Sequence, residues 1–144
     1  MALMRRAVLL LLISGASPVA AVPAPTPSAP MSLAALSQLE TGLWQLDVQG
    51  RTPRQMCVSD PMTLVQIEHD QPGCSRFVIA NDPKSATIHY SCQRSGWGRS
   101  TLRVENPRAA TIHTQGIARN APFDYAVQAK RVGGCGGQVS AKRR

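Results

Sequence analysis

Apolar side chains recur at every second position through most of residues 42–135, and a period of two is typical of β-strands. Clusters of Gly, Pro, Asn and Asp, which favour turns, separate the alternating runs at residues 81–84, 96–98, 106–108 and 120–122. Connections this short favour antiparallel hairpins. We therefore expect a mainly β fold, a curved antiparallel meander of about six strands that is partly barrel-like.

One segment, residues 59–69, departs from this period. Ser59 or Asp60 can cap a helix, Pro61 suits the first helical position, and apolar residues follow at helical spacing. The pattern predicts one short helix between the second and third strands.

The inward-facing positions of the alternation include most of the aromatic residues. If the sheet curves, these positions line a small apolar pocket on its concave face. The candidate pocket residues are Trp44, Leu46, Phe77, Tyr90, Phe123 and Tyr125.

The N-terminus has the layout of a secretory signal peptide. Arg5 and Arg6 precede an apolar run at residues 7–13, and small residues follow at 19–21. The run is too short to span a bilayer, so no membrane span is expected once residues 1–21 are cleaved. We expect a Pro/Ala-rich linker at 22–40, a folded domain at 41–136 and a basic disordered tail at 137–144.

Export would place the four cysteines in an oxidising compartment, where they can form two disulfides. Three pairings are possible, and strand parity helps to choose among them. A turn at residues 82–85 would set Ser75 opposite Cys92, which leaves Cys74 facing the other side of the sheet. A register slip of one residue reverses this argument. With that register, the preferred pairs are Cys57–Cys74 and Cys92–Cys135.

The formal charge is +8, and Arg5 and Arg6 would leave with the signal, giving +6. Such a charge can serve solubility alone or attract an anionic partner. A predicted hairpin concentrates arginines around a tryptophan that either covers the core or forms an exposed anchor. The candidate binding surface is Arg94, Trp97, Arg99 and Arg103.

The sequence favours neither a metal site nor catalysis. His89 and His113 fall at polar strand positions and His69 lies in a loop, so we expect all three to face solvent. No His-x-x-x-His or Cys-x-x-Cys pair occurs, and no Gly-x-Ser-x-Gly motif marks a nucleophile. We therefore expect no metal, no cofactor and no enzymatic activity.

Several short motifs occur in a characteristic order: Gly42-Leu43-Trp44, then Cys57 and Cys74, then Tyr90-x-Cys92, then the run from Lys130 to Cys135. In this order and spacing, which covers about residues 40–136, the chain resembles the bacterial domain of unknown function 3617. Thr41 stands where members often carry proline, and residues 52–57 lack the methionine-rich stretch that many members show. The resemblance implies an exported, mostly β bacterial protein and brings no activity, ligand or catalytic residue.

These observations predict a periplasmic or secreted protein that acts as a non-enzymatic binding module of the cell envelope. Its expected partners are an envelope protein, a lipid or an anionic polymer, with no specific nucleic acid. The alternative is a proteinaceous inhibitor of a periplasmic or extracellular hydrolase, which would present the loop at residues 96–99 to its target.

Overall fold

The computed structural model describes residues 32–136, so the expected signal peptide, most of the expected linker and the basic tail lie outside the described residues. The described elements are two short 3-10 helices and seven strands: η1 (Leu36–Gln38), β1 (Gly42–Val48), β2 (Arg54–Val58), η2 (Pro61–Val65), β3 (Ser75–Asn81), β4 (Ser85–Cys92), β5 (Gly96–Asn106), β6 (Ala109–Ala118) and β7 (Ala121–Gly133).

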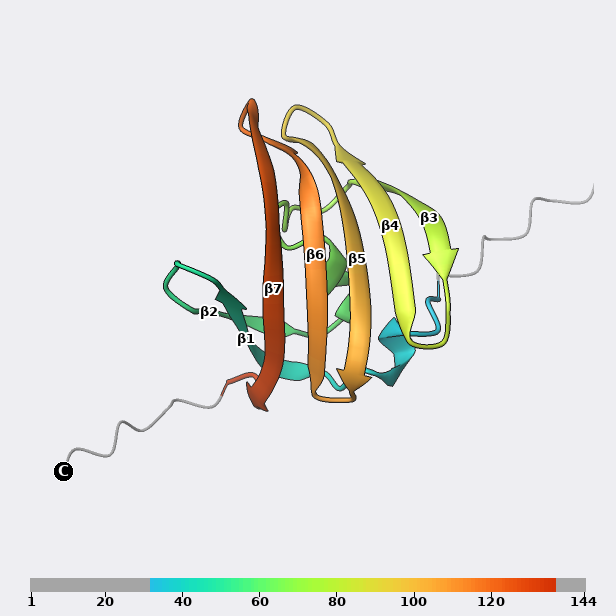
Figure 1. Cartoon of the computed structure of the whole chain (residues 1–144), viewed down its shortest axis with the longest axis vertical. Coiled ribbons are helices and arrows are strands. Elements are labelled where there is room, and N and C mark those ends of the chain that lie inside the picture. The colour runs from blue at the N-terminus through green and yellow to red at the C-terminus, as the bar shows by residue number, and fades with distance from the viewer. Residues whose placement is uncertain (1–31, 137–144) are drawn as a thin grey trace, which may run out of the picture. The chain divides into compact units, whose positions relative to one another are not determined.

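All seven strands form one antiparallel sheet in the order β2-β1-β7-β6-β5-β4-β3. Strands β3 to β7 are successive hairpins, whereas β1 pairs with the last strand, β7. The sheet is curved and open, with β2 and β3 as its two edges (Figure 1). The prediction of a mainly β, antiparallel fold is confirmed.

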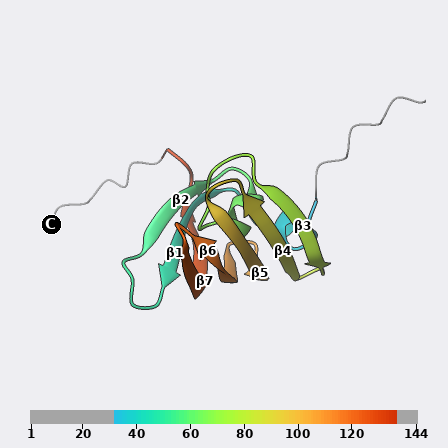
Figure 2. The ribbon, with the colours of Figure 1, turned by 90° about the horizontal axis from the view of Figure 1, so that it is seen from above.

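The chain between β2 and β3 carries η2 from one edge of the sheet to the other, along its concave side (Figure 2). We call the side that η1 and η2 cover the inner face and the opposite side the outer face. The predicted helix is present as the 3-10 helix η2. Asp60 caps it by accepting a hydrogen bond from the Met62 N–H at 2.9 Å, and Pro61 begins it.

The expected linker does not extend to residue 40. Leu33, Leu36 and Leu39 are 2%, 4% and 6% exposed and pack in the same core as Trp44. Their spacing of three puts them on one side of a tight helical turn, which covers the inner face. The described part of this segment therefore belongs to the domain, and the proposed boundary at residue 41 is wrong.

One predicted turn is also wrong. Residues 96–98 lie inside β5, and the chain instead reverses through Gln93 and Arg94, where the Ser95 N–H donates to the Cys92 carbonyl at 3.1 Å. Glycines normally indicate turns, but here Gly98 lies on the inner face, where a neighbouring ring occupies the space of a side chain.

Both disulfides differ from the preferred pairs. Cys57 bonds Cys135, with 5.5 Å between their Cα atoms, and Cys74 bonds Cys92, with 4.3 Å. The cause is a β-bulge at Ile79: Val78 pairs with Ile88, but Ala80 pairs with Thr87. The bulge shifts the register by one residue, so that Ser75 faces Ser91 and Cys74 falls opposite Cys92.

The second disulfide follows from the sheet order. Leu43 of β1 pairs with Cys57 on β2 and with Gly133 on β7, so the chain leaving β7 reaches Cys57 two residues later. Two disulfides with no free cysteine suit an oxidising environment outside the cytoplasm.

Candidate ligand-binding groove

The inner face changes character along the strands. One row of paired residues is entirely aliphatic, and we call it the aliphatic row: Ala86, Leu102, Ile112 and Val127. Four residues further along the strands lies a row with two aromatic residues and two glycines, which we call the glycine row: Tyr90, Gly98, Gly116 and Phe123.

The glycines make room for rings and for close strands. A methyl group on Gly98 would overlap Cζ and Oη of Tyr90, and one on Gly116 would overlap the backbone carbonyl oxygen of Trp97. Tyr90 therefore lies across β5 and is 1% exposed. Its hydroxyl reaches the chain that crosses the inner face.

That chain places His69 beside Tyr90. The His69 Nδ1 lies 3.2 Å from the Tyr90 hydroxyl, and its Nε2 lies 2.9 Å from the Ser95 carbonyl oxygen. Because a carbonyl only accepts, a neutral His69 carries its proton on Nε2 and accepts from Tyr90 through Nδ1. His69 is 5% exposed, so the prediction that it faces solvent is wrong. His69 lies outside the strands, so no alternation of apolar and polar residues could predict that its side chain points inward.

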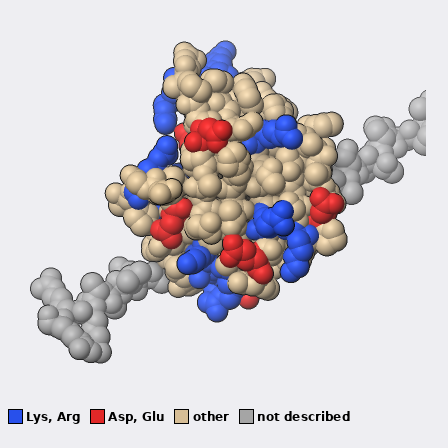
Figure 3. Space-filling model, viewed as in Figure 1, with Lys and Arg blue, Asp and Glu red and all other residues tan. Residues whose placement is uncertain are grey.

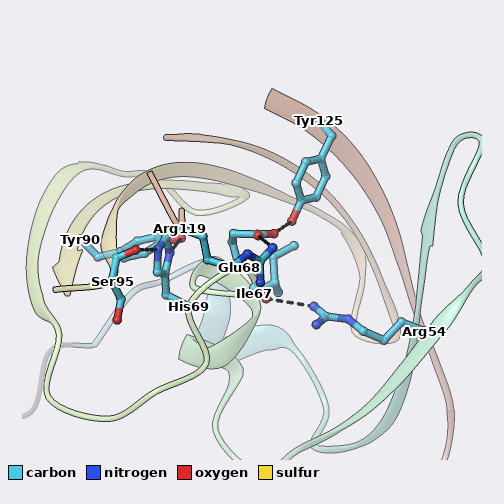
Figure 4. A network of polar contacts seen from close by, with 8 residues as sticks. All are labelled: Arg54, Ile67, Glu68, His69, Tyr90, Ser95, Arg119 and Tyr125. Atoms are coloured by element: carbon cyan, nitrogen blue, oxygen red, sulfur yellow. Dashed lines mark hydrogen bonds and ion pairs between the residues drawn. The ribbon is translucent and has the colours of Figure 1, made fainter. Parts of the chain in front are cut away.

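Glu68 is at the centre of the polar contacts (Figure 4). Its Oε2 accepts a hydrogen bond from the Tyr125 hydroxyl at 2.6 Å, and its Oε1 lies 3.5 Å from an Arg119 guanidinium nitrogen. The guanidinium of Arg54 donates to the Ile67 carbonyl at 2.9 Å. The Glu68 side chain is 17% exposed and the Arg119 side chain 88%, so the carboxylate lies inward and the guanidinium outward.

Both tyrosines remain protonated at neutral pH. Burial raises the pKa of Tyr90 to about 12, with a smaller contribution from the Glu68 charge and an opposing one from a hydrogen bond with Thr114. Burial also raises the pKa of Tyr125, as do its hydrogen bond with Glu68 and the Glu68 charge, while Arg54 and Arg51 partly oppose the rise. Tyr125 is thus a hydrogen-bond donor to Glu68.

Three adjoining cavities surround Glu68. The first, of about 180 Å³, has aliphatic side chains on one part of its wall and polar or charged ones on the rest: Leu46, Val48, Ile67 and Val127, then Tyr125, Thr52, Glu68, Arg51 and Arg54. The second, of about 350 Å³, shares Arg51, Glu68 and Tyr125 with the first and adds Phe123 and Arg119. The third, of about 290 Å³, shares Glu68 and Arg119 with the second and adds His69, Asp70, Gln71, Arg94 and Ser95. We call these three cavities together the groove.

Four arginines and two carboxylates line the groove. Arg119 is the one arginine of the four that has a carboxylate within 4.0 Å among residues 32–136. The guanidinium of Arg51 lies over the Tyr125 ring, 4.7 Å from its centroid. The remaining members are Arg54, Arg94, Glu68 and Asp70. The groove therefore has a net charge of +2, and its leucine, isoleucine and valine side chains are all at one end, which we call the apolar end.

The candidate pocket residues separate into three groups. Leu46, Phe123 and Tyr125 line the groove. Trp44 and Tyr90 are on the inner face but are 0% and 1% exposed, so they are core residues. Phe77 is 68% exposed, and its place in the pocket was wrong because it lies on the β3 segment whose register the Ile79 bulge shifts.

The candidate arginine surface is divided between the two faces. Trp97, Arg99 and Arg103 alternate with buried residues along β5 and lie on the outer face. Trp97 is 40% exposed and stacks on His89 with 5.5 Å between ring centroids, so it does not cover the core. Arg94 lines the groove instead.

On the face of the sheet turned toward the viewer in Figure 1, acidic and basic side chains are interspersed (Figure 3). At exposed strand positions, the His113 Nε2 lies 2.9 Å from a carboxylate oxygen of Asp124. The outer face therefore carries both signs of charge in a mixed arrangement, whereas in the groove four arginines outnumber two carboxylates.

Within residues 32–136, no three His, Cys, Asp or Glu side chains are grouped as a metal site requires. In the same part of the chain, no helix has the length and hydropathy needed to cross a membrane.

Sequence reasoning missed most of the groove. Arg51, Arg54, Glu68 and Arg119 were not candidates because they lie in loops and at a strand end, where no periodicity indicates a face. Arg119 and Asn120 form the two-residue connection of a hairpin, and that position was the one available signal.

No family model matches this chain, and no curated protein or solved structure matches it either. The resemblance to the domain of unknown function 3617 therefore stays a prediction.

Proposed function

We propose that this protein is a non-enzymatic binding module of the cell envelope and that its groove holds a small amphipathic anion. The observation that carries the proposal is the lining of the groove, where four arginines outnumber two carboxylates and one end is apolar. Charge complementarity favours a ligand with an anionic group, and the apolar end favours a short hydrocarbon part on the same molecule.

The apolar end limits the size of that hydrocarbon part. A cavity of about 180 Å³ between Leu46, Ile67 and Val127 has room for a short chain or a branched side chain. Burying each methylene group there contributes about 0.8 kcal/mol to binding. A short-chain amphiphile fits this space better than a full-length lipid tail.

The location rests on two supports. The first is the signal-like pattern of residues 1–21, and the second is the pair of disulfides, which persist in oxidising compartments. Membership of the domain of unknown function 3617 agrees with both and is part of the proposal.

The polar groups around Glu68 are better placed for binding than for acid-base catalysis. Its carboxylate is occupied by Tyr125 and Arg119, and the raised pKa values of both tyrosines keep these groups from acting as bases near neutral pH. The inhibitor alternative offered residues 96–99 as an example of the rigid loop that would meet the target. These residues are part of β5 and do not form a loop, so this example does not support the alternative.

Titration calorimetry with hexyl phosphate tests the proposal, with hexanol and inorganic phosphate as the two halves of the same probe. We expect hexyl phosphate to bind more tightly than either half. The paired substitution Arg51→Gln and Arg54→Gln should weaken binding, whereas Arg103→Gln on the outer face should not. The proposal would be contradicted if the three probes gave equal heats of binding. It would also be contradicted if the groove and outer-face variants lost the same amount of affinity for hexyl phosphate.

A further inference from the structure

Two arginines adopt a backbone conformation that arginine normally avoids. Among the described residues other than glycine, positive φ angles occur at Arg94 (64°), Arg119 (49°) and Asn120 (61°). This left-handed region costs roughly 1–2 kcal/mol for residues with a Cβ, and glycine or asparagine usually occupies it. Asn120 fits that preference and the two arginines do not.

Both arginines lie at hairpin tips at the same end of the sheet. Arg94 is in the turn between β4 and β5, and Arg119 is in the two-residue turn between β6 and β7, a turn type that requires positive φ at both positions. Gly96 pairs with Ala118, which brings the two turns side by side. Both arginines line the third cavity of the groove.

Contacts in the folded chain do not account for arginine at these positions. The ion pair of Arg119 with Glu68 is long, at 3.5 Å, and the Arg119 side chain is 88% exposed, so this pair adds little stability. Arg94 is exposed and has no carboxylate within 4.0 Å among residues 32–136. Backbone strain that stability does not explain is characteristic of functional sites.

We infer that Arg94 and Arg119 form a clamp for the oxyanion group of the ligand, a phosphate or a carboxylate, at the polar end of the groove. This inference rests on the proposed function and specifies which end of the groove holds the charge. Ser95 and Gln71 line the same cavity and supply neutral hydrogen-bonding groups.

The carboxylates in this cavity do not prevent such binding. Glu68 already accepts from Tyr125, and it keeps that hydrogen bond when Arg119 turns toward an incoming oxyanion. Asp70 is exposed, so water and salt screen its charge. The hydrocarbon part of the ligand would then extend past Tyr125 toward Leu46 and Val127 at the apolar end.

Replacing each arginine by glycine gives two opposite expected effects. Arg94→Gly relieves the strain, so the midpoint of thermal unfolding should rise by about 4 °C. Arg119→Gly also loses its ion pair and should leave the midpoint unchanged or higher. Each variant should bind hexyl phosphate and hexanoate at least about tenfold more weakly, the effect of losing one charge-assisted contact worth about 1.4 kcal/mol.

Two control variants separate strain from charge. Asn120→Gly changes the same turn without removing a cation and should leave binding unchanged. Arg103→Gln removes a cation from the outer face and should also leave binding unchanged. Hexyl phosphate and hexanoate together distinguish a phosphate ligand from a carboxylate ligand by their relative affinities for the wild-type protein.

The outcomes distinguish the clamp from the proposed function. If the Arg51→Gln and Arg54→Gln variant loses binding while both glycine variants keep it, the clamp is wrong and the groove stands. If the glycine variants lose binding because they unfold at a lower temperature, the two arginines are structural and the clamp is also wrong. If the wild-type protein binds neither probe, both proposals fail.

Discussion

The aliphatic row and the glycine row lie on the same inner face of the same strands, yet they have opposite properties. Ile112 and Leu102 in the aliphatic row are 0% exposed and belong to the hydrophobic core cluster. Tyr90 in the glycine row is 1% exposed, but its hydroxyl is hydrogen-bonded to a buried histidine. Between the two rows, the Ser100 and Thr114 hydroxyls lie 2.8 Å apart and mark the change.

The difference shows how one curved sheet can combine a stable core and a polar groove. Aliphatic side chains fill the space under the first row, whereas glycines leave space under the second row for rings and for the chain that carries Glu68 and His69. The first row supplies stability through burial. The second row supplies the space in which the chain carrying the charged Glu68 lies.

The largest effect is expected in the aliphatic row. Ile112→Ala removes three carbons from a fully buried site and should lower the free energy of unfolding by about 3 kcal/mol. Urea denaturation followed by circular dichroism measures this change. Hexyl phosphate binding to the folded variant should stay at the wild-type level, and a loss of binding would show that the two rows are not separable.

The second-largest effect should be a pH dependence of the free energy of unfolding, caused by Tyr90 in the glycine row. Tyr90 has its ordinary pKa near 10 in the unfolded chain and about 12 in the folded one, so ionisation favours unfolding. The stabilisation is complete below pH 10 and is lost as the pH rises toward 12, a loss of about 2–3 kcal/mol at 1.36 kcal/mol per pKa unit.

Phenolate absorbance, followed as the pH is raised, measures the ionisation of the tyrosines. The chain has 2 tyrosines, so the signal of each can be assigned. Phenolate should form together with the loss of sheet structure, and Tyr125→Phe leaves Tyr90 as the sole reporter. Phenolate formation near pH 10 in a chain that is still folded would contradict the burial of Tyr90.

Gly98→Ala should have a smaller effect on stability. The added methyl group meets the Tyr90 ring, and overpacking of this kind costs about 2 kcal/mol. The control is Gly133→Ala, because a methyl group there has nothing within 4 Å and should leave the unfolding midpoint nearly unchanged. Equal effects of the two substitutions would mean that Gly98 does not make room for Tyr90.

Tyr125→Phe should have the smallest effect. It removes the hydrogen bond to Glu68 while keeping the ring under Arg51, at a cost of about 1 kcal/mol. Thermal unfolding of the two proteins, compared side by side, measures it. A variant as stable as the wild type would show that the Tyr125–Glu68 hydrogen bond contributes no net stability.

The two rows also differ in how far the sequence predicts them. Alternation of Leu102 and Ile112 with polar neighbours indicates the strands and their inward face, because burial imposes a period of two. In the glycine row, Gly98 looks like part of a turn, since a missing side chain carries no information about the face it would occupy. The ring that fills this space comes from another strand, and local sequence does not reveal it.

The disulfide pairing shows a second limit. Strand parity gives the right pairs only when the register is known, and the extra residue at Ile79 reverses the faces of everything before it in β3. That one bulge turns Phe77 outward and brings Cys74 to Cys92. Nothing about Ile79 itself distinguishes it from an ordinary strand residue.

The pairing of β1 with β7 has a consequence for how the chain matures. Because synthesis runs from the N-terminus, Cys57 is made 78 residues before its partner Cys135 and meets the thiol of Cys74 first. A bond formed in that interval has to be exchanged before the native one can close. Production of this small protein in native form should therefore depend on a disulfide isomerase or a thiol-shuffling buffer.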